Sequence, residues 1–486
     1  NGIPNVGDYT LPCWIRNARI LDDNNMLPDY LQPPKLLQKI VDVYHNNQEE
    51  PTKIFNHSIG SMVPCRLKHM SSWAAAIDNL SYSNDIIVIQ AAGNISRSNN
   101  NVHNPGIIQM LGSGKQYPSY LLEDCCRISN PAQSLQALTV GSICADSYEH
   151  YDTKSLGDKD KPSGFSRTGP GIWDAIKPEV VEYGGDCAII NSTPIRISAP
   201  ENVCPDLIRT SPPGPAYAKD AVGTSFAAPK VAYIAAELQK ILPDEPALLY
   251  RALIVQSARW PQWAWNAPAG EYSNILRHMG YGLPSLSRAT TNNEYRVTLI
   301  TNGLIEIATR EAHIYQVPIP QEMREIGEDF DILVEITLSY TAKPRRTRRS
   351  IRRYLSTWLD WDSSKLGEEP EVFRRRILEE GRAINDEGSI SWVIGTKANN
   401  GQAEEFRRGT GTVQKDWAVL KSHQLRDAFC IAVRGHEGWD PAFKSKYSLA
   451  VSFEAIDQDI EIYESIRTQI EVEVNNQEVE IELGVE

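Results

Sequence analysis

A short block of small and hydroxyl-bearing residues, Gly223-Thr224-Ser225-Phe226-Ala227-Ala228-Pro229, opens a long apolar segment that runs to Leu242. Thr224 and Ser225 are residue types that start helices, and a proline is tolerated near a first turn. A serine placed there meets free backbone N–H groups and the positive end of the helix dipole. That environment favours an alkoxide-like nucleophile or the oxyanion that it creates. Taken alone, however, the block is equally well explained by an ordinary capped core helix.

A hydrolytic serine also needs a general base, a group that orients the base, and donors for the oxyanion. The block Ala91-Ala92-Gly93-Asn94 follows a continuous apolar run at 86–89, which is typical of a strand buried on both faces of a parallel sheet. Chemistry collects at the carboxyl ends of such strands. The amide of Asn94 could therefore complete an oxyanion hole with the backbone N–H of Ser225. An asparagine that follows a glycine is more often a turn residue.

The elements that must position these residues alternate between strand and helix. The apolar patterns predict strands at 14–20, 53–58, 86–89, 135–143 and 176–181, and helices at 34–44, 67–80, 224–242 and 248–258. The β-α-β order with short connections implies right-handed crossovers and a doubly wound, mostly parallel α/β sheet. Residues 95–130 are rich in Asn, Ser and Gly, so a long surface insertion is expected there.

From about residue 294 the pattern changes to strand-like runs that are separated by long charged connections. The expected strands lie at 295–300, 314–317, 332–340, 390–394, 429–433 and 447–453. This arrangement predicts an all-β sandwich or jelly-roll domain. Near the end, residues 470–483 alternate apolar and acidic side chains around an Asn-rich turn, which predicts an amphipathic hairpin. We therefore expect an α/β domain at 1–291 and a β domain at 292–486.

Composition excludes several classes of protein. A chain of 486 residues is too long for one ordinary core, and no apolar run reaches the roughly 18 residues of a membrane span. The net charge of −13 argues against a general nucleic-acid binder. Eight cysteines show no C-x-x-C spacing, which indicates reduced thiols and a cytoplasmic setting. No Cys/His/carboxylate cluster suggests a metal, and we expect no cofactor.

One surface feature stands apart, because residues 343–353 contain seven positive charges in eleven residues. A nucleic-acid patch and a peptide-docking surface are two interpretations of this cluster. We favour a third, a solvated loop after the strand at 332–340, given the acidic chain. Five tryptophans of the β domain are expected in its core: Trp358, Trp361, Trp392, Trp417 and Trp439.

In combination, the motifs resemble the subtilisin-like serine peptidases, or subtilases, over about residues 12–290. The block at 223–229 matches the surroundings of that family's nucleophile, and 91–94 matches its oxyanion-hole block. Asn56-His57-Ser58-Ile59-Gly60-Ser61 is similar to the strand that forms one wall of the substrate cleft. The resemblance implies a serine endopeptidase acting on a protein or peptide, with Ser225 and Asn94 as catalytic residues. The substrate-binding residues that it implies are Ser58, Ile59, Gly60, Ala91, Ala92, Gly93 and Thr224.

The sequence departs from the family in one respect. Neither the family's Asp-Thr/Ser-Gly turn nor its His-Gly-Thr block is found, and none of the nine histidines is followed by Gly-Thr. His57 lies beside the cleft strand, but the resemblance implies that its side chain points into the sheet. Because the chain also starts Asn-Gly-Ile-Pro, without an initiator Met or signal peptide, we expect Asp and His to lie upstream and this chain to be inactive. The alternative is a degenerate subtilase fold that serves as a binding or scaffold module.

The C-terminal region carries a second resemblance. Residues 340–346, 434–439 and 447–452 are similar to the C-terminal domain of bacterial cytosolic subtilases. Some of those proteins are encoded beside an AAA-type ATPase in phage-defence systems. The resemblance therefore implies an AAA-type ATPase partner and a role in defence.

Overall fold

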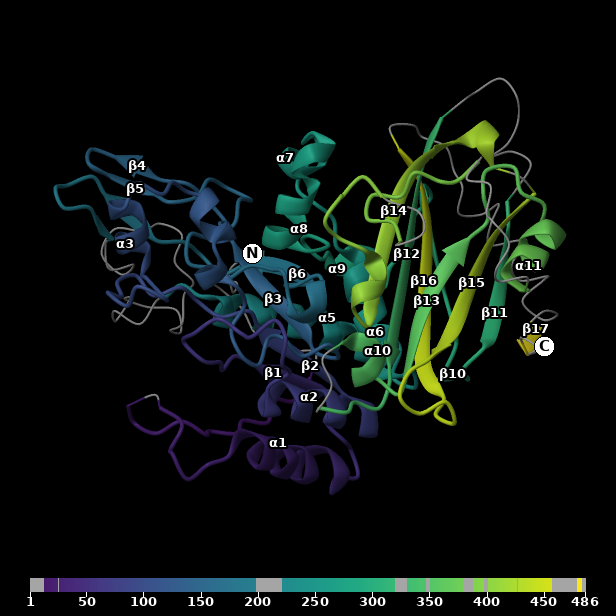
Figure 1. The fold of residues 1–486 in the computed structure, drawn as a ribbon, viewed down its shortest axis with the longest axis horizontal. Coiled ribbons are helices and arrows are strands. Elements are labelled where there is room, and N and C mark those ends of the chain that lie inside the picture. Colours follow the sequence, from purple (N-terminus) through teal and green to yellow (C-terminus); the bar gives the residue numbers. More distant parts are fainter. Residues whose placement is uncertain are drawn as a thin grey trace, which may run out of the picture. The chain divides into compact units, whose positions relative to one another are not determined.

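The computed structural model describes residues 13–24, 26–197, 221–319, 330–346, 350–378, 388–396, 401–425 and 427–456, and the backbone of 479–482. Its helices (Figure 1) are α1 (Pro33–Val41), α2 (Ser72–Ser83), α3 (Ile107–Gly112), α5 (Thr224–Ile241), α6 (Ala247–Ser257), α7 (Gln262–Trp265), α8 (Tyr272–Met279), α9 (Leu286–Thr290), α10 (Ile351–Tyr354) and α11 (Pro370–Leu378). The strands of the first half are β1 (Ile54–His57), β2 (Ile87–Ala91), β3 (Leu138–Ile143), β4 (Glu149–His150), β5 (Thr153–Ser155), β6 (Val180–Tyr183), β7 (Ala188–Ile190) and β8 (Arg196–Ile197). Those of the second half are β9 (Arg296–Ile300), β10 (Ile305–Ile307), β11 (Glu311–Pro318), β12 (Asp331–Thr341), β13 (Thr357–Ser363), β14 (Val413–Lys421), β15 (Ala428–Glu437), β16 (Ser445–Ile456) and β17 (Val479–Glu482).

The chain forms two compact units that do not follow chain order. The first comprises Asn1–Pro243, Ser257–Ala267 and Asn274–Leu286, and the second comprises Asp244–Gln256, Pro268–Ser273 and Ser287–Glu486. Helix α6 thus belongs, apart from its last residue, to the unit that holds the C-terminal strands. A domain boundary at 291/292 stays a prediction. In the described parts of both units, no helix is long and apolar enough to cross a membrane.

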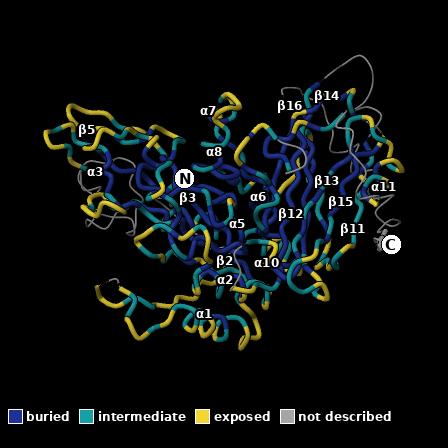
Figure 2. The backbone as a smooth tube through the Cα atoms, in the orientation of Figure 1, coloured by how far each residue is buried: buried dark blue, intermediate teal, exposed yellow. Residues whose placement is uncertain are grey.

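A parallel sheet in the order β1-β2-β3-β6 forms the centre of the first unit. Strands β2 and β3 are buried along their whole length (Figure 2), as expected of a sheet covered on both faces. Val88 of β2 packs in one cluster with Ile77 and Leu80 of α2, while α5 contacts all four strands. The predicted α/β fold with a parallel sheet is confirmed.

Two predictions for the start of this unit differ from the structure, a strand that is absent and a helix that begins later than expected. Residues 14–20 form no strand, and Trp14 and Ile15 are 94% and 72% exposed. This segment is instead held by Arg16, which donates hydrogen bonds to residues of the 44–52 region. The helix predicted at 67–80 begins only at Ser72, because the side chain of Ser71 accepts a hydrogen bond from the Ala74 N–H and caps it.

The expected surface insertion at 95–130 instead contributes to the core. Its apolar side chains form a buried cluster with Ile95, Phe165 and Cys187: Ile107, Met110, Tyr120, Leu121 and Cys126. They are irregularly spaced because α3 is short and is followed by single helical turns rather than a long helix. Residues 95–130 therefore lack the regular spacing of apolar residues that indicates a long amphipathic helix. A small antiparallel sheet in the order β4-β5-β7-β8 completes the unit.

The second unit contains two antiparallel sheets. One has the order β10-β16-β12-β14, with β9 also paired to β16, and the other has the order β13-β15-β11-β17. Side chains of the two sheets meet, as in the edge-to-face pair of Phe429 and Phe453 at 5.7 Å between ring centres. The two antiparallel sheets are the part of the sandwich prediction that the structure bears out, whereas the jelly-roll connectivity stays a prediction.

Several details of this unit differ from prediction. Residues 390–394 form no strand, while β13 and β14 were not predicted. Of the five tryptophans, Trp358 and Trp439 are only half-buried, and the other three are buried. Most of the predicted hairpin at 470–483 lies outside the described residues. Its second strand corresponds to β17, whose backbone pairs with β11.

Candidate active site

The helix that carries Ser225 starts directly after a glycine. Gly223 precedes the first residue of α5 and donates its N–H to the Gly184 carbonyl at 2.9 Å. A side chain at Gly223 would place its Cβ 3.1 Å from Nδ2 of Asn94, so glycine leaves room for that amide. Ser225, the second helical residue, is half-buried. Its N–H is one of the four at a helix start that have no intrahelical acceptor.

The side chain of Asn94 is held in one orientation by Thr224. Oδ1 of Asn94 accepts hydrogen bonds at 3.0 Å from both the backbone N–H and the hydroxyl of Thr224. Since a backbone N–H can only donate, this contact identifies the amide oxygen. The hydroxyl of Thr224 in turn accepts from the Gly93 N–H at 3.2 Å. Nδ2 of Asn94 has no hydrogen-bond partner among the described residues, and it is therefore free to donate.

Two serines join the end of β1 to the start of α5. The Ser225 hydroxyl donates to the Ser58 carbonyl at 3.2 Å, and the Ser58 hydroxyl donates to the Ser225 carbonyl at 3.3 Å. Pro229 lies in the second turn of α5 rather than the first, and it lacks the N–H that would normally bond to the carbonyl four residues earlier. That carbonyl is the one of Ser225. Because of Pro229, the Ser225 carbonyl has no hydrogen bond from a backbone N–H four residues later, and it accepts one from the Ser58 hydroxyl instead.

The two segments proposed to bind substrate follow neighbouring parallel strands. Ser58, Ile59 and Gly60 follow β1, and Ala92 and Gly93 follow Ala91, the last residue of β2. The Ser129 hydroxyl lies between the two segments and donates to the Ala92 carbonyl at 3.3 Å. A Cβ at Gly60 would come within 2.9 Å of this hydroxyl, and one at Gly93 would overlap it. The two glycines therefore allow the chain to approach Ser129 closely.

The histidine nearest in sequence to this site faces elsewhere. Nδ1 of His57 is 2.6 Å from the side-chain oxygen of Gln90, and its ring packs edge-on against Trp73. Burial lowers the pKa of His57, although the Gln90 contact opposes the shift. Within the described residues, the Ser225 hydroxyl bonds only to the Ser58 carbonyl. The structure thus brings together Ser58, Asn94, Thr224 and Ser225, and His57 is not directed at them.

A match to a family model identifies the protein family of this chain. Residues 26–282 match the family model described as the subtilase family, Peptidase S8. This chain belongs to the subtilase family. The match spans more than half of the 486 residues, and it includes both the Asn94 and the Ser225 blocks.

Relatives of this subtilase include proteins with little functional description. An uncharacterized protein of Sinorhizobium fredii, y4bN, is 27% identical over 417 residues, which cover 82% of this chain and 91% of that protein. Among solved structures, a protease of Pseudoalteromonas arctica is 18% identical with a TM-score of 0.28, covering 50% of this chain and 52% of its own. The protease MycP1, without its N-terminal propeptide, is 20% identical with a TM-score of 0.30, covering 54% and 67%. The subtilase thus spans about half of the first of these structures.

The sequence did not indicate Arg167, a residue whose hydrogen bonds join several loops of this subtilase near Asn94. Arg167 is buried and donates from Nε to the Asn94 carbonyl at 3.1 Å. Its two terminal nitrogens reach four further oxygens, those of Cys125, Arg127, Met62 and Asn104. Arg167 lies between Gly164 and Gly169 in a segment rich in Gly, Pro and Ser, and that loop composition gave no indication of its role.

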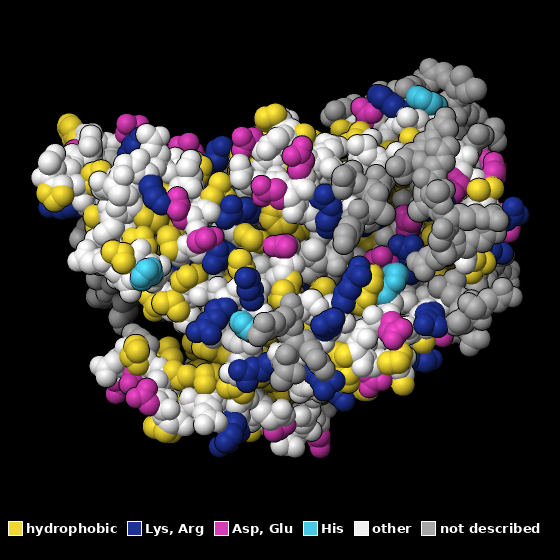
Figure 3. All heavy atoms as spheres, viewed as in Figure 1, with side chains coloured by type: hydrophobic (Ala, Val, Ile, Leu, Met, Phe, Trp, Pro, Cys, Tyr) yellow, Lys and Arg dark blue, Asp and Glu magenta, His cyan; other side chains and the backbone are white. Residues whose placement is uncertain are grey.

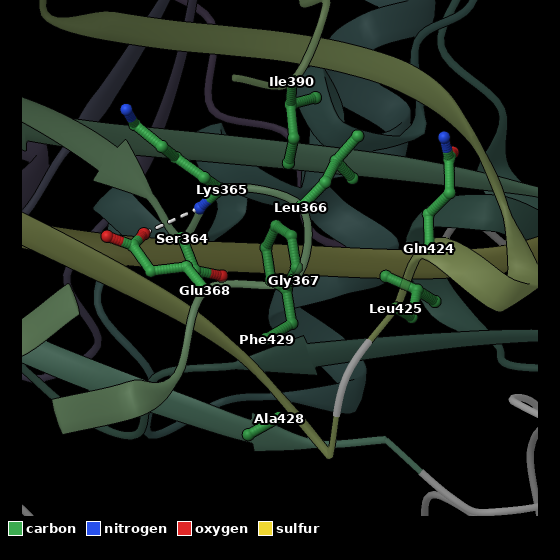
Figure 4. A pocket seen from close by; sticks show the side chains of 10 residues that line it. All are labelled: Ser364, Lys365, Leu366, Gly367, Glu368, Ile390, Gln424, Leu425, Ala428 and Phe429. Atoms are coloured by element: carbon green, nitrogen blue, oxygen red, sulfur yellow. Dashed lines mark hydrogen bonds between the residues drawn. The ribbon is translucent and has the colours of Figure 1, made fainter. Parts of the chain in front are cut away.

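Two further features of the described residues bear on the choice of site, the absence of a metal-binding cluster there and one small pocket. No group of three or more His, Cys, Asp or Glu side chains in the described part could hold a metal ion. A pocket of the second unit lies between the ends of β13 and β15 (Figure 4), where the Lys365 N–H donates to the Glu368 carboxylate at 2.8 Å. Its volume is about 10 Å³, which is enough for one water molecule. The residues named by the subtilase motifs do not line it.

Proposed function

We propose that this subtilase is a serine endopeptidase that forms an acyl-enzyme at Ser225. The observation that carries the proposal is the orientation of Asn94, whose Oδ1 is held by Thr224 while Nδ2 remains free to donate. An amide nitrogen fixed beside the start of the serine helix is the type of donor that an oxyanion requires. The N–H of Ser225 supplies the second donor.

The proposed reaction uses these groups in sequence. Oγ of Ser225 attacks the scissile carbonyl carbon while a base removes the hydroxyl proton, and the carbonyl oxygen becomes an oxyanion held by Asn94 and the Ser225 N–H. The base returns the proton to the leaving amine as the C–N bond breaks. Water then hydrolyses the acyl ester by the same steps. Backbone groups of Ser58–Gly60 and Ala91–Gly93 bind the extended peptide by strand addition.

The reaction also needs a base and a carboxylate that orients it, and no His or carboxylate of the described residues bonds to the Ser225 hydroxyl. We propose that the base and the carboxylate come from the family's Asp and His blocks, located outside these 486 residues. Loss of triad members lowers turnover by about 10⁴- to 10⁶-fold. The chain by itself is therefore expected to be essentially inactive.

We extend the proposal to the setting of the enzyme. The seven cysteines in the described residues are free, and five are buried, which suits a reducing cytoplasm. The C-terminal motifs support an AAA-type ATPase partner and a role in phage defence. Copurification with the tagged natural protein tests this proposal. An ATPase should copurify in a stoichiometric amount, and a preparation without such an ATPase would contradict the proposed partner.

Cleavage of labelled casein tests the peptidase proposal. The chain alone should release no Ser225-dependent fluorescence, and the polypeptide that carries the Asp and His blocks should release it steadily. Ser225→Ala should abolish this activity, whereas Ser391→Ala, at an exposed serine of the second unit, should preserve it. Activity that survives Ser225→Ala would contradict the proposal.

The alternative is a degenerate subtilase that serves as a binding or scaffold module. The contact of the Ser225 hydroxyl with the Ser58 backbone carbonyl favours it, because that hydroxyl is not engaged with a base. The upstream coding sequence distinguishes the two functions. An Asp-Thr/Ser-Gly turn and a His-Gly-Thr block there support the enzyme, and their absence supports the scaffold.

A further inference from the structure

A surface of the second unit combines aromatic rings with cations that have no ion-pair partner among the described residues. Its cations come from the basic cluster at 343–353, and its rings come from β13, β15 and the chain between β15 and β16. Figure 3 shows Lys and Arg side chains beside hydrophobic and His side chains in this region of the unit. We call it the basic-aromatic surface, and its residues are Lys343, Arg345, Arg346, Arg352, Arg353, Trp358, His436, Trp439 and Phe443.

Three planar groups are stacked on this surface. Trp358 of β13 and His436 of β15 are register partners in the antiparallel pair. Their rings lie 3.9 Å apart between centres at an angle of 10°. The guanidinium of Arg352 lies 4.6 Å from the centre of the Trp358 ring. Arg352 is exposed, so the stack ends in a planar cation at the protein surface.

A second group of cations lies over neighbouring rings. Nζ of Lys343 is 4.8 Å from the ring centre of Phe443, and the guanidinium of Arg345 is 5.5 Å from that of Trp439. The sequence favoured a solvated loop for these residues. Arg345 and Arg346 are exposed, as that prediction requires, and the contacts add that aromatic side chains hold Lys343 and Arg345 in place.

The positive charge of this surface is not neutralised by the described residues. None of its five Lys and Arg side chains forms an ion pair with a described carboxylate. Two nearby carboxylates already have charged partners, since Asp360 pairs with Arg434 and His436, and Glu437 pairs with Arg310. Asp440 accepts the Ala442 N–H, so one carboxylate is set against five cations. Burial opposes the ionisation of Asp360, but Arg434 and His436 outweigh it and hold its pKa well below the ordinary value. A local excess of positive charge thus exists on a chain of net charge −13.

We propose that the basic-aromatic surface binds single-stranded nucleic acid. Arginine presents planar donors that match phosphate, and bases stack on aromatic rings and guanidinium planes. The exposed face of Arg352 extends the stack of Trp358 and His436 and offers such a plane to a base. An acidic peptide would form ion pairs with the cations, but its carboxylates would not stack on the planar groups. Nucleic acid can do both, and it therefore fits this surface better. The proposal does not depend on peptidase activity.

Fluorescence anisotropy with labelled oligonucleotides tests this proposal on the full chain. The probes are oligo(U) and oligo(dT), each about 20 nucleotides long, and an oligoglutamate of the same charge. The surface is altered by Arg345→Ala with Arg352→Ala, and the stack by Trp358→Leu. The matched control is Arg374→Ala with Arg375→Ala on α11, which also removes two arginines. Thermal unfolding of each variant confirms that it is folded.

Both oligonucleotides should bind the wild type and the control. Each surface variant should raise Kd by about tenfold or more. The double variant should also reduce the slope of log K against log salt by about 0.7, since Arg345 contributes one phosphate contact whereas Arg352 stacks on a base. Trp358→Leu should leave that slope unchanged. Preference for one probe would identify the RNA or DNA as the ligand.

Three results would overturn the proposal. The wild type could bind neither oligonucleotide at low salt. Oligoglutamate could bind as tightly as the oligonucleotides, which would indicate an acidic protein partner. The control could lose as much affinity as the surface variant, which would place binding elsewhere on the chain.

Discussion

At the scale of residues, the side-chain oxygens of Asn94, Thr224 and Ser225 have named hydrogen-bond partners, and the Asn94 amide nitrogen has none among the described residues. The Thr224 hydroxyl accepts a hydrogen bond from the Gly93 N–H and donates one to Oδ1 of Asn94. One hydroxyl thus links the segment after β2 to the start of α5. The sequence predicted Ser225 and Asn94 because their blocks are short and contiguous. It did not reveal Ser129 or Arg167, whose roles depend on loops that meet only in three dimensions.

Substitution of Asn94 should affect turnover more than binding. In the polypeptide with a complete triad, we expect Asn94→Ala to lower kcat by about 10²- to 10³-fold with little change in KM, because an oxyanion donor acts mainly in the transition state. Steady-state kinetics on a peptide substrate measure both constants. Asn46→Ala, at an exposed site, is the control. A loss confined to KM would indicate a substrate-binding role instead.

His278, a buried residue of α8, should make stability depend on pH. Burial, assisted by Arg277, lowers its pKa from 6.5 to about 3. The unfolded chain therefore binds a proton below about pH 6.5 that the folded chain does not bind, and stability falls as pH decreases towards 3. Between pH 7 and pH 5 we expect wild type to lose about 2 kcal/mol more unfolding free energy than His278→Leu. Urea unfolding at the two pH values measures this, and equal losses would refute the assignment.

At the scale of elements, predictions succeeded where burial leaves a regular apolar pattern. The run at 86–89 is apolar because β2 is buried inside the parallel sheet, and the segment at 224–242 is apolar because α5 packs against all four strands of that sheet. Strand β14 was missed because Lys415 and Asp416 interrupt its pattern. Their charges are paired inside the unit, with Glu335 at 2.8 Å and Arg408 at 3.2 Å. Sequence alone does not show that a buried charge has such a partner.

The turn after β2 should tolerate no side chain at Gly93. Its φ of +99° is unfavourable for other residues, and a Cβ would lie 2.9 Å from the Cβ of Ser129 and closer to its hydroxyl. We expect Gly93→Ala to lower the unfolding free energy by about 2 kcal/mol or more. Gly270→Ala, where a Cβ would meet nothing within 4 Å, should change it by less than about 0.5 kcal/mol. Denaturant unfolding compares the two, and similar losses would contradict this account.

At the scale of the whole molecule, each of the two units is built from three separate stretches of the chain. Helix α6 follows the serine helix in sequence, yet its Gln256 bonds to Glu335, Thr337 and Ser452 of the second unit. Lys415 adds a bond to the Gln256 carbonyl at 3.0 Å. The apolar pattern predicted a helix at 248–258 but gave no sign of which unit it belongs to.

Fragments of the second unit should therefore differ in stability. A fragment of residues 244–486 retains α6, whereas residues 292–486 lose it and leave the buried Lys415–Glu335 pair uncovered. We expect both fragments to unfold cooperatively, the longer one with a Tm several degrees higher. Circular dichroism melting and size-exclusion chromatography provide the comparison. Equal Tm values would show that α6 is not an integral part of this unit.

Covalent labelling with a fluorophosphonate tests the central claim, that Ser225 is a nucleophile completed by residues outside these 486. The reagent reacts with a serine only when a base has activated it. We predict that the full-length natural protein is labelled, that mass spectrometry places the adduct on Ser225, and that these 486 residues alone are not labelled. An unlabelled, folded natural protein, or an adduct on another serine, would contradict the account.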